Sequence, residues 1–295
     1  MAIKSSNMKP LTDDPQRYRD VYYNAFYKMA LKDILFEKVT QFFDTTVMMR
    51  LTHAIEGGEE FSVLGVGLGD GPHELHFMKS LRSQFSSICI VGVDLSESML
   101  NTFQERVAAL ELNCESSVSC QLFNGPFSEF FAGSVLSKNK YNLISSIHSL
   151  YHLGDFETTF IQLASMMKDK GFIIVVCAKD NLISKTFNKF TWLSKNTQTL
   201  AGLSSTNVRE FAHSQGYDVT TVDIPIQWDI TEVFEDQSEF GNKLIDFFTQ
   251  FAFFRKTAPS ELMDELVNFW RLVSILDENG RILALSHEEI LLISK

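Results

Sequence analysis

Residues 61–81, FSVLGVGLGDGPHELHFMKSL, join a short apolar run to a helical pattern through a cluster of glycines. The run FSVLGV has the composition of a buried strand. The segment that opens with Pro72 is predicted as a helix, because proline suits a first helical turn. Between them, four glycines leave the backbone bare: Gly65, Gly67, Gly69 and Gly71. Since the start of the following helix offers free N–H groups, this turn indicates a ligand that lies against the main chain.

Strand-like and helix-like patterns alternate along the rest of the chain. Strands are predicted over residues 61–66, 88–94, 118–124, 141–147, 171–178 and 217–226, with a hairpin-like pair of strand segments within 282–294. Helices are predicted between them and after them, including one over residues 241–254. This alternation predicts an α/β fold, in which a mostly parallel sheet of about seven strands carries helices on both faces.

The same patterns predict the organisation of the chain. Residues 1–14 are predicted as a loose tail, and residues 15–295 as a single domain. Within that domain we distinguish a helical cap over 15–50, a core over 61–178 and a region of further helices and terminal strands over 179–295.

Composition and charge exclude several classes of partner. The 295 residues carry a formal net charge of -11, from 26 basic and 37 acidic side chains, and they contain no basic run. No nucleic-acid partner is therefore expected, since such binding rests on clustered Lys and Arg. No signal peptide or stretch of membrane-spanning length is recognised, so we expect no membrane partner and a cytoplasmic, monomeric protein. No metal is expected, because the cysteines lack metal-ligand spacing: Cys89, Cys114, Cys120 and Cys177.

The spacing of the glycines distinguishes two kinds of ligand. A dinucleotide site has the pattern GxGxxG, whereas this turn has the pattern GxGxG. Asp94 ends the second predicted strand, where an acid accepts the hydroxyl groups of an adenosine ribose. This combination is typical of class I methyltransferases that use S-adenosylmethionine. Two alternatives remain open, a nicotinamide-dependent oxidoreductase and glycines that serve only a tight turn.

Histidine and tyrosine side chains gather after the fourth predicted strand, in ISSIHSLYHLGDF. His148, Tyr151 and His152 lie where the loops of such a sheet carry reactive groups. Imidazole and phenol groups hold a substrate nitrogen or relay its proton near neutral pH. We therefore interpret these three residues as candidate catalytic and substrate-binding residues. Methyl transfer itself requires mainly that a lone pair be aligned with the methyl carbon.

Several segments together resemble the histamine N-methyltransferase family. The similar segments are YRDVYY, LGVGLGDG, IHSLYHLGDF, GFIIVVCAKDN, DITEVF, GNKLIDFFTQ and KTAPSEL, in this order along the chain. The resemblance identifies the chain as a divergent member. It implies a Rossmann-like class I methyltransferase fold in which residues 61–178 bind the cofactor and residues 179–295 cover the substrate. The implied activity is S-adenosylmethionine-dependent N-methylation of a small amine or an imidazole-containing metabolite, histamine-like or carnosine-like.

The resemblance also implies site residues. The implied cofactor contacts are Gly65, Gly67, Gly69, Asp94, Met99, Phe127, Ser128 and Ile147. The implied substrate contacts are His148, Tyr151, His152 and Phe187, together with Phe247 or Phe251 and with Ser286 or His287.

Three positions depart from the family pattern. The family has a glutamate where this chain has Leu31, a glutamine at His148 and an asparagine near Ser286. Unmatched polar contacts discriminate strongly between substrates, so these changes weigh against histamine itself. Leu64 also replaces the acid that often precedes the first glycine. A catalytically decayed protein that binds S-adenosylmethionine for regulation is therefore a further alternative.

Overall fold

The computed structural model describes residues 8–55, 60–111, 117–196 and 203–295. Cys114 and residues 1–7 of the predicted tail lie outside these ranges. The chain divides into two compact units. One, here called the sheet unit, comprises Leu35–Cys177, Ser205–Asp223 and Glu289–Lys295. The other, here called the aromatic unit, comprises Met1–Ile34, Ala178–Ser204 and Ile224–Glu288.

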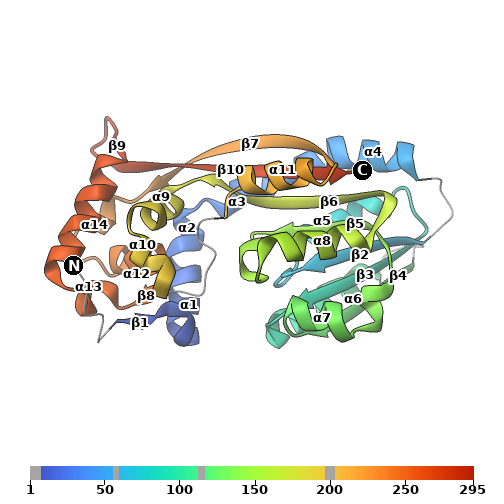
Figure 1. The fold of residues 1–295 in the computed structure, drawn as a ribbon, viewed down its shortest axis with the longest axis horizontal. Helices are drawn as coiled ribbons and strands as arrows, with labels where there is room; N and C mark the ends of the chain where they lie inside the picture. The colour runs from blue at the N-terminus through green and yellow to red at the C-terminus, as the bar shows by residue number, and fades with distance from the viewer. Residues whose placement is uncertain (1–7, 56–59, 112–116, 197–202) are drawn as a thin grey trace. The chain divides into compact units, whose positions relative to one another are not determined.

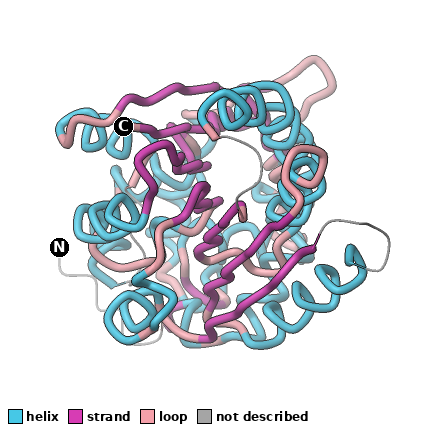
Figure 2. The backbone as a smooth tube through the Cα atoms, turned by 90° about the vertical axis from the view of Figure 1, so that its right-hand side faces the viewer, coloured by secondary structure: helices cyan, strands magenta, loops and turns pink. Residues whose placement is uncertain are grey.

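The main sheet has the strand order β4-β3-β2-β5-β6-β10-β7, and β9 pairs with β10 beside this path (Figure 1). The pairs β2–β3, β3–β4, β2–β5 and β5–β6 are parallel. Helices lie on both faces of the sheet (Figure 2), so the predicted fold class is confirmed. The strands are β2 (Phe61–Val66), β3 (Ser87–Asp94), β4 (Ser117–Asn124), β5 (Tyr141–Ile147), β6 (Met167–Asp180), β7 (Asp218–Asp229), β9 (Ile275–Leu276) and β10 (Ile282–Ser294).

The strand order reverses at β2. The chain runs from β2 outward through β3 to β4, and then returns to the other side of β2 as β5. Gly65 on β2 therefore pairs with Gly92 of β3 on one side and with Ser145 of β5 on the other. Open parallel sheets bind ligands at the carboxyl ends of strands where the order reverses. The loops after β2, β3 and β5 are consequently the place to look for a site.

The sheet unit owes its core to apolar strands and to helices with one apolar face. Val63, Leu64, Ile90 and Ile144 are completely or almost completely buried, as expected for strands covered on both faces. The helices of this unit are α4 (Met48–Ala54), α5 (Pro72–Leu81), α6 (Glu97–Glu111), α7 (Phe127–Gly133), α8 (Phe156–Met166) and α11 (Ser205–Ser214). Helix α3 (Lys32–Phe42) contains residues of both units.

The aromatic unit is built from short helices around a core of aromatic rings. Its other elements are β1 (Lys9–Pro10), α1 (Pro15–Val21), α2 (Tyr27–Met29), α9 (Leu182–Lys189), α10 (Thr191–Asn196), α12 (Glu239–Thr249), β8 (Phe251–Ala252), α13 (Phe254–Thr257) and α14 (Ser260–Leu272). Strand β1 pairs with β8, and Leu11 just after it is completely buried. Residues 8–14, within the stretch predicted as a loose tail, are thus packed against the rest of this unit.

Two predicted elements are wrong in detail. Residues 282–294 form one continuous strand, β10, rather than a hairpin-like pair. Ser286, Glu288 and Glu289 in its middle are polar, but they are buried and have partners. Ser286 donates a hydrogen bond to Glu288 at 3.4 Å, and Glu289 forms an ion pair with Arg209 at 3.3 Å. These partners compensate for the cost of burying polar groups within a strand.

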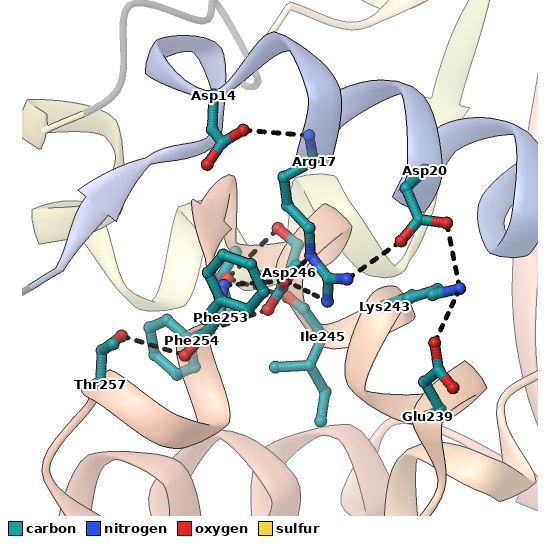
Figure 3. A network of polar contacts seen from close by, with 11 residues as sticks. Asp14, Arg17, Asp20, Glu239, Lys243, Ile245, Asp246, Phe253, Phe254 and Thr257 are labelled. Carbon is teal, nitrogen blue, oxygen red and sulfur yellow. Dashed lines mark hydrogen bonds and ion pairs between the residues drawn. The ribbon is translucent and has the colours of Figure 1, made fainter.

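The helix predicted over residues 241–254 is also wrong, because α12 ends at Thr249. Gln250 and Phe253 adopt left-handed backbone conformations, with φ of 61° and 54°. The carboxylate of Asp246 accepts hydrogen bonds from the amides of Phe253 and Phe254, each at 2.8 Å, which fixes this turn (Figure 3).

The same carboxylate forms a two-bond ion pair with Arg17 of α1. The Nε of Arg17 lies 2.8 Å and its Nη2 2.7 Å from Oδ2 of Asp246. Arg17 also contacts Asp20, which pairs with Lys243 at 3.0 Å (Figure 3). Asp246 is almost completely buried. It therefore joins α1, α12 and the start of α13 through one carboxylate.

Candidate functional site

The glycine loop after β2 has a backbone that only glycine adopts easily. Gly67, Gly69 and Gly71 all have left-handed conformations, with φ of 63°, 59° and 60°. A Cβ at Gly67 would overlap the side chain of Ser149, and one at Gly71 would overlap the ring of Phe103. A Cβ at Gly69 would meet nothing within 4 Å. The loop is therefore packed at Gly67 and Gly71, and its backbone is open to a ligand at Gly69.

This difference predicts that two alanine variants affect stability and cofactor binding in opposite order of size. Gly69→Ala should lower the free energy of unfolding by roughly 1 kcal/mol, the cost of a left-handed residue with a side chain. Gly67→Ala should cost roughly 1–3 kcal/mol more, because Ser149 must move. Gly69→Ala should instead weaken cofactor binding most, since its methyl group enters the open space. Urea denaturation and cofactor titration of both variants measure the two effects, and equal stability losses would contradict this account.

Asp94 connects the end of β3 to the glycine loop. Its carboxylate accepts hydrogen bonds from the amide of Gly69 at 2.9 Å and from the amide of Ser96 at 2.8 Å. The amide of Gly67 donates to the carbonyl of Val93 at 2.7 Å. Asp94 thus lies beside the open part of the loop, as the sequence predicted for an acid that meets a ribose.

The loop after β4 lies next to Asp94. The amide nitrogen of the Asn124 side chain donates to the carbonyl of Leu95 at 3.0 Å, and the main-chain amide of Gly125 donates to the carbonyl of Asp94 at 3.0 Å. Of the predicted cofactor contacts, Phe127 is buried in the first turn of α7 and Ser128 is exposed. Met99 of α6 and Ile147 of β5 are half-buried. All eight predicted cofactor residues belong to the sheet unit.

His148 follows β5 directly and has a left-handed backbone, with φ of 53°. Its amide donates to the carbonyl of Val176 on β6 at 2.8 Å, so the conformation is fixed by the sheet. A histidine in this region costs of order 1–3 kcal/mol, and such strain is concentrated at functional sites. The cost supports the hypothesis that the position of this imidazole matters.

Tyr151 and His152 lie on the short 3₁₀ helix Leu150–His152. Their rings meet edge to face, with centroids 4.5 Å apart. His152 presents part of its side chain to solvent, and the packing around its imidazole lowers the pKa below the usual value. A lowered pKa means that the neutral imidazole predominates near pH 7, and it also makes this ring a weaker base.

The other predicted substrate residues belong to the aromatic unit. Phe187 is almost completely buried on α9, and its neighbour Thr186 accepts a hydrogen bond from the indole of Trp270 at 2.8 Å. On β10, Ser286 is buried and His287 is half-buried. Phe247 stacks on Phe26 with centroids 3.9 Å apart, within a cluster of rings: Tyr18, Tyr22, Phe26, Trp228, Phe247 and Phe248.

Two residues near the glycine loop escaped the sequence prediction. Ser149 donates a hydrogen bond to the carbonyl of Val66 at 2.6 Å and contacts Ser146 at 2.8 Å. Glu74 of α5 is almost completely buried and accepts a hydrogen bond from Ser145 at 2.7 Å. Burial raises the pKa of Glu74 to about 7, although the bond from Ser145 acts in the opposite direction. Its spacing on α5 with Phe77, Met78 and Leu81 marks the apolar face, which was the available signal.

Comparison with known proteins agrees with this geometry. A family model described as "Methyltransferase domain" matches residues 36–222. Histamine N-methyltransferase from Cavia porcellus is 24% identical over 89% of this chain and 90% of its own length. Histamine N-methyltransferase from Danio rerio is 24% identical over 97% of this chain and 98% of its own length. Carnosine N-methyltransferase 2 from Gallus gallus is 23% identical over 76% of this chain and 71% of its own length.

These matches confirm the resemblance predicted from the sequence and decide between the two classes of ligand. Among the residues that the structure describes, no helix is long and apolar enough to cross a membrane. The open backbone at Gly69 and the carboxylate of Asp94 fit the adenosine part of such a cofactor. The chain therefore belongs to the methyltransferase domain family, and its cofactor is S-adenosylmethionine.

Proposed function

We propose that the protein transfers the methyl group of S-adenosylmethionine to a nitrogen of a small amine or an imidazole-containing metabolite. One observation carries this proposal. The methyltransferase model ends at residue 222, but the similarity to histamine N-methyltransferase from Danio rerio extends over 97% of the chain. The similarity therefore includes much of the aromatic unit, which a general methyltransferase domain does not require.

Methyl transfer requires the protein mainly to align the acceptor nitrogen with the methyl group and to bind the acceptor in its neutral form. The bound cofactor supplies a methyl group already activated by its sulfonium. The acceptor nitrogen must be unprotonated, because only its lone pair reacts. We propose that His148, Tyr151 and His152 orient this nitrogen and remove its proton.

The aromatic unit supplies the groups that we propose to contact the acceptor. Phe247 contributes a ring to the aromatic cluster, and a cationic or heteroaromatic amine binds favourably beside aromatic rings. Phe187, Ser286 and His287 complete the proposed set. Ser286 already donates to Glu288, so a carboxylate lies on the same strand two residues away.

An acceptor panel tests this proposal. Histamine, carnosine, histidine and aromatic ethylamines are each incubated with S-adenosylmethionine, and formation of S-adenosylhomocysteine is followed. We expect turnover with at least one of these amines. His148→Asn, which tolerates the left-handed backbone but removes the imidazole, should lower kcat roughly 100-fold or more without changing cofactor affinity.

The same panel distinguishes the alternatives. Binding of S-adenosylhomocysteine without turnover of any amine in the panel would contradict the proposal and favour a regulatory binding protein. Equal losses of turnover and cofactor affinity in His148→Asn would instead identify His148 as a structural residue.

A further inference from the structure

The cofactor site lacks an acid where the cationic cofactor would be expected to need one. Leu64, just before the first glycine of the loop, is completely buried and apolar. S-adenosylmethionine carries one net positive charge from its sulfonium, ammonium and carboxylate groups. Its product S-adenosylhomocysteine lacks the sulfonium and carries no net charge. A negative charge near the loop would therefore favour the donor over the product.

Glu74 supplies a carboxyl group next to the first glycine of this loop. A Cβ at Gly65 would lie 3.3 Å from Cγ of Glu74, so the side chain packs directly against the main chain at Gly65. Ser145 holds the carboxyl group by a hydrogen bond of 2.7 Å to Oε1. Ser145 is the register partner of Gly65 on β5, so both neighbours of the carboxyl group belong to the point where the strand order reverses.

The surroundings of Glu74 leave its charge uncompensated. β2 and β5 contribute Gly65 and Ser145, which carry no charge, and the loop contributes Asp70, whose negative charge opposes ionisation of Glu74. Asp70 is paired with Arg106 of α6 at 2.7 Å. Among the described side chains, Asp70 is the charged group that acts on Glu74. A buried carboxylate in this environment is stabilised by a cation on the other side of the loop.

We propose that Glu74 is the group that makes this site prefer S-adenosylmethionine to S-adenosylhomocysteine, acting through the thin backbone at Gly65 on the positive charge of the cofactor. Glu74 is a positioning residue, because Ser145 rather than the ligand contacts its carboxyl group. It acts on the ligand through the electric field of its negative charge. The consequence is a site that holds the donor and releases the product. The inference concerns the cofactor alone, so it is independent of whether the acceptor is a small amine.

Glu74 titrates near neutral pH, which makes the proposal measurable. With a pKa of about 7, the carboxyl group is mostly neutral at pH 6 and mostly charged at pH 8. The preference for donor over product should therefore rise with pH. Isothermal titration calorimetry of both ligands at several pH values gives the ratio of the two affinities. We expect this ratio to increase roughly fivefold between pH 6 and pH 8, the size of a moderate interaction between opposite charges across the loop.

Matched variants isolate the effect of Glu74. Glu74→Gln keeps the shape of the side chain and should show a ratio that differs from the wild-type ratio at pH 8 but not at pH 6. Dividing the wild-type ratio by that of Glu74→Gln removes the ionisation of the ligands' own amino groups. Glu105→Gln removes an exposed carboxylate of α6 and should behave as wild type. Ser145→Ala removes the bond that favours ionisation, so the midpoint should move to higher pH.

The titration of Glu74 itself, measured without ligand and with each ligand, gives a separate readout. The carboxyl carbon of Glu74 followed by NMR should titrate near pH 7, and this midpoint should fall further with S-adenosylmethionine than with S-adenosylhomocysteine. The proposal is overturned if Glu74→Gln keeps the wild-type pH dependence of the ratio. It is equally overturned if both ligands move the midpoint by the same amount.

Discussion

Replacing Asp246 with alanine is expected to lower the free energy of unfolding of the aromatic unit by roughly 3–5 kcal/mol, the cost of breaking a buried ion pair from one side. Arg17 would lose two bonds to a carboxylate, and the amides of Phe253 and Phe254 would lose their acceptor. The substitution leaves the guanidinium group with its contact to Asp20 but without its buried partner, and it leaves two main-chain donors without their acceptor (Figure 3).

Tryptophan fluorescence reports this loss selectively. The chain has three tryptophans, Trp192, Trp228 and Trp270, and all three belong to the aromatic unit. Urea denaturation followed by their emission therefore measures that unit. Asp236→Ala is the matched control, because Asp236 pairs with Arg255 while most of its side chain is exposed, and such pairs contribute little. A similar midpoint for the two variants would show that Asp246 does not stabilise this region as described.

Asp94→Ala should weaken S-adenosylmethionine binding roughly 10- to 100-fold, the effect of losing charged hydrogen bonds of about 1.5–3 kcal/mol. Two effects combine. The ribose hydroxyls lose their acceptor, and the amides of Gly69 and Ser96 lose the carboxylate that orders the loop. Asp94→Asn keeps one acceptor oxygen and should lose less. Glu105→Gln, at an exposed carboxylate of the same unit, serves as the control.

Calorimetric titration of the three variants measures these affinities. Because Asp94 is tied to Gly69, the alanine variant should also bind S-adenosylhomocysteine more weakly, by a similar factor. Wild-type affinity in Asp94→Ala would contradict the assignment of the cofactor to this loop.

The glycine loop and Asp94 were predictable because their signal is local. A left-handed turn favours glycine at each such position, and Gly67, Gly69 and Gly71 all adopt that conformation. An acid at the end of the second strand follows from the strand pattern alone. The cofactor was predicted from this loop and Asp94, the fold class from the alternation of strand and helix patterns, and the resemblance to histamine N-methyltransferases from several segments along the chain. All three predictions are confirmed.

The breaks in the helices were not predictable, because they depend on distant partners. Leu31, Gln250 and Phe253 adopt left-handed conformations without being glycine. For Phe253, the cause is the carboxylate of Asp246, seven residues earlier, which accepts its amide. The apolar pattern of residues 241–254 continues through this break, so a prediction from periodicity extends the helix too far.

Glu74 shows how a charged residue on an apolar helix face is overlooked. Its position on the stripe with Phe77, Met78 and Leu81 indicated burial, but the identity of the side chain suggested the surface. The bond from Ser145 explains why a carboxyl group is tolerated there. The acceptor residues are a different case, since Phe187, Phe247, Ser286 and His287 belong to one unit and His148 to the other, and their role stays a prediction.

The central claim is that this site methylates a nitrogen of a small molecule. Its most direct test is a reaction of methyl-labelled S-adenosylmethionine with the amine that turns over fastest, followed by tandem mass spectrometry of the product. The account predicts one added methyl group on a nitrogen of the amine and one equivalent of S-adenosylhomocysteine. A label found on oxygen, sulfur or carbon, or remaining on the donor with every acceptor, would contradict it.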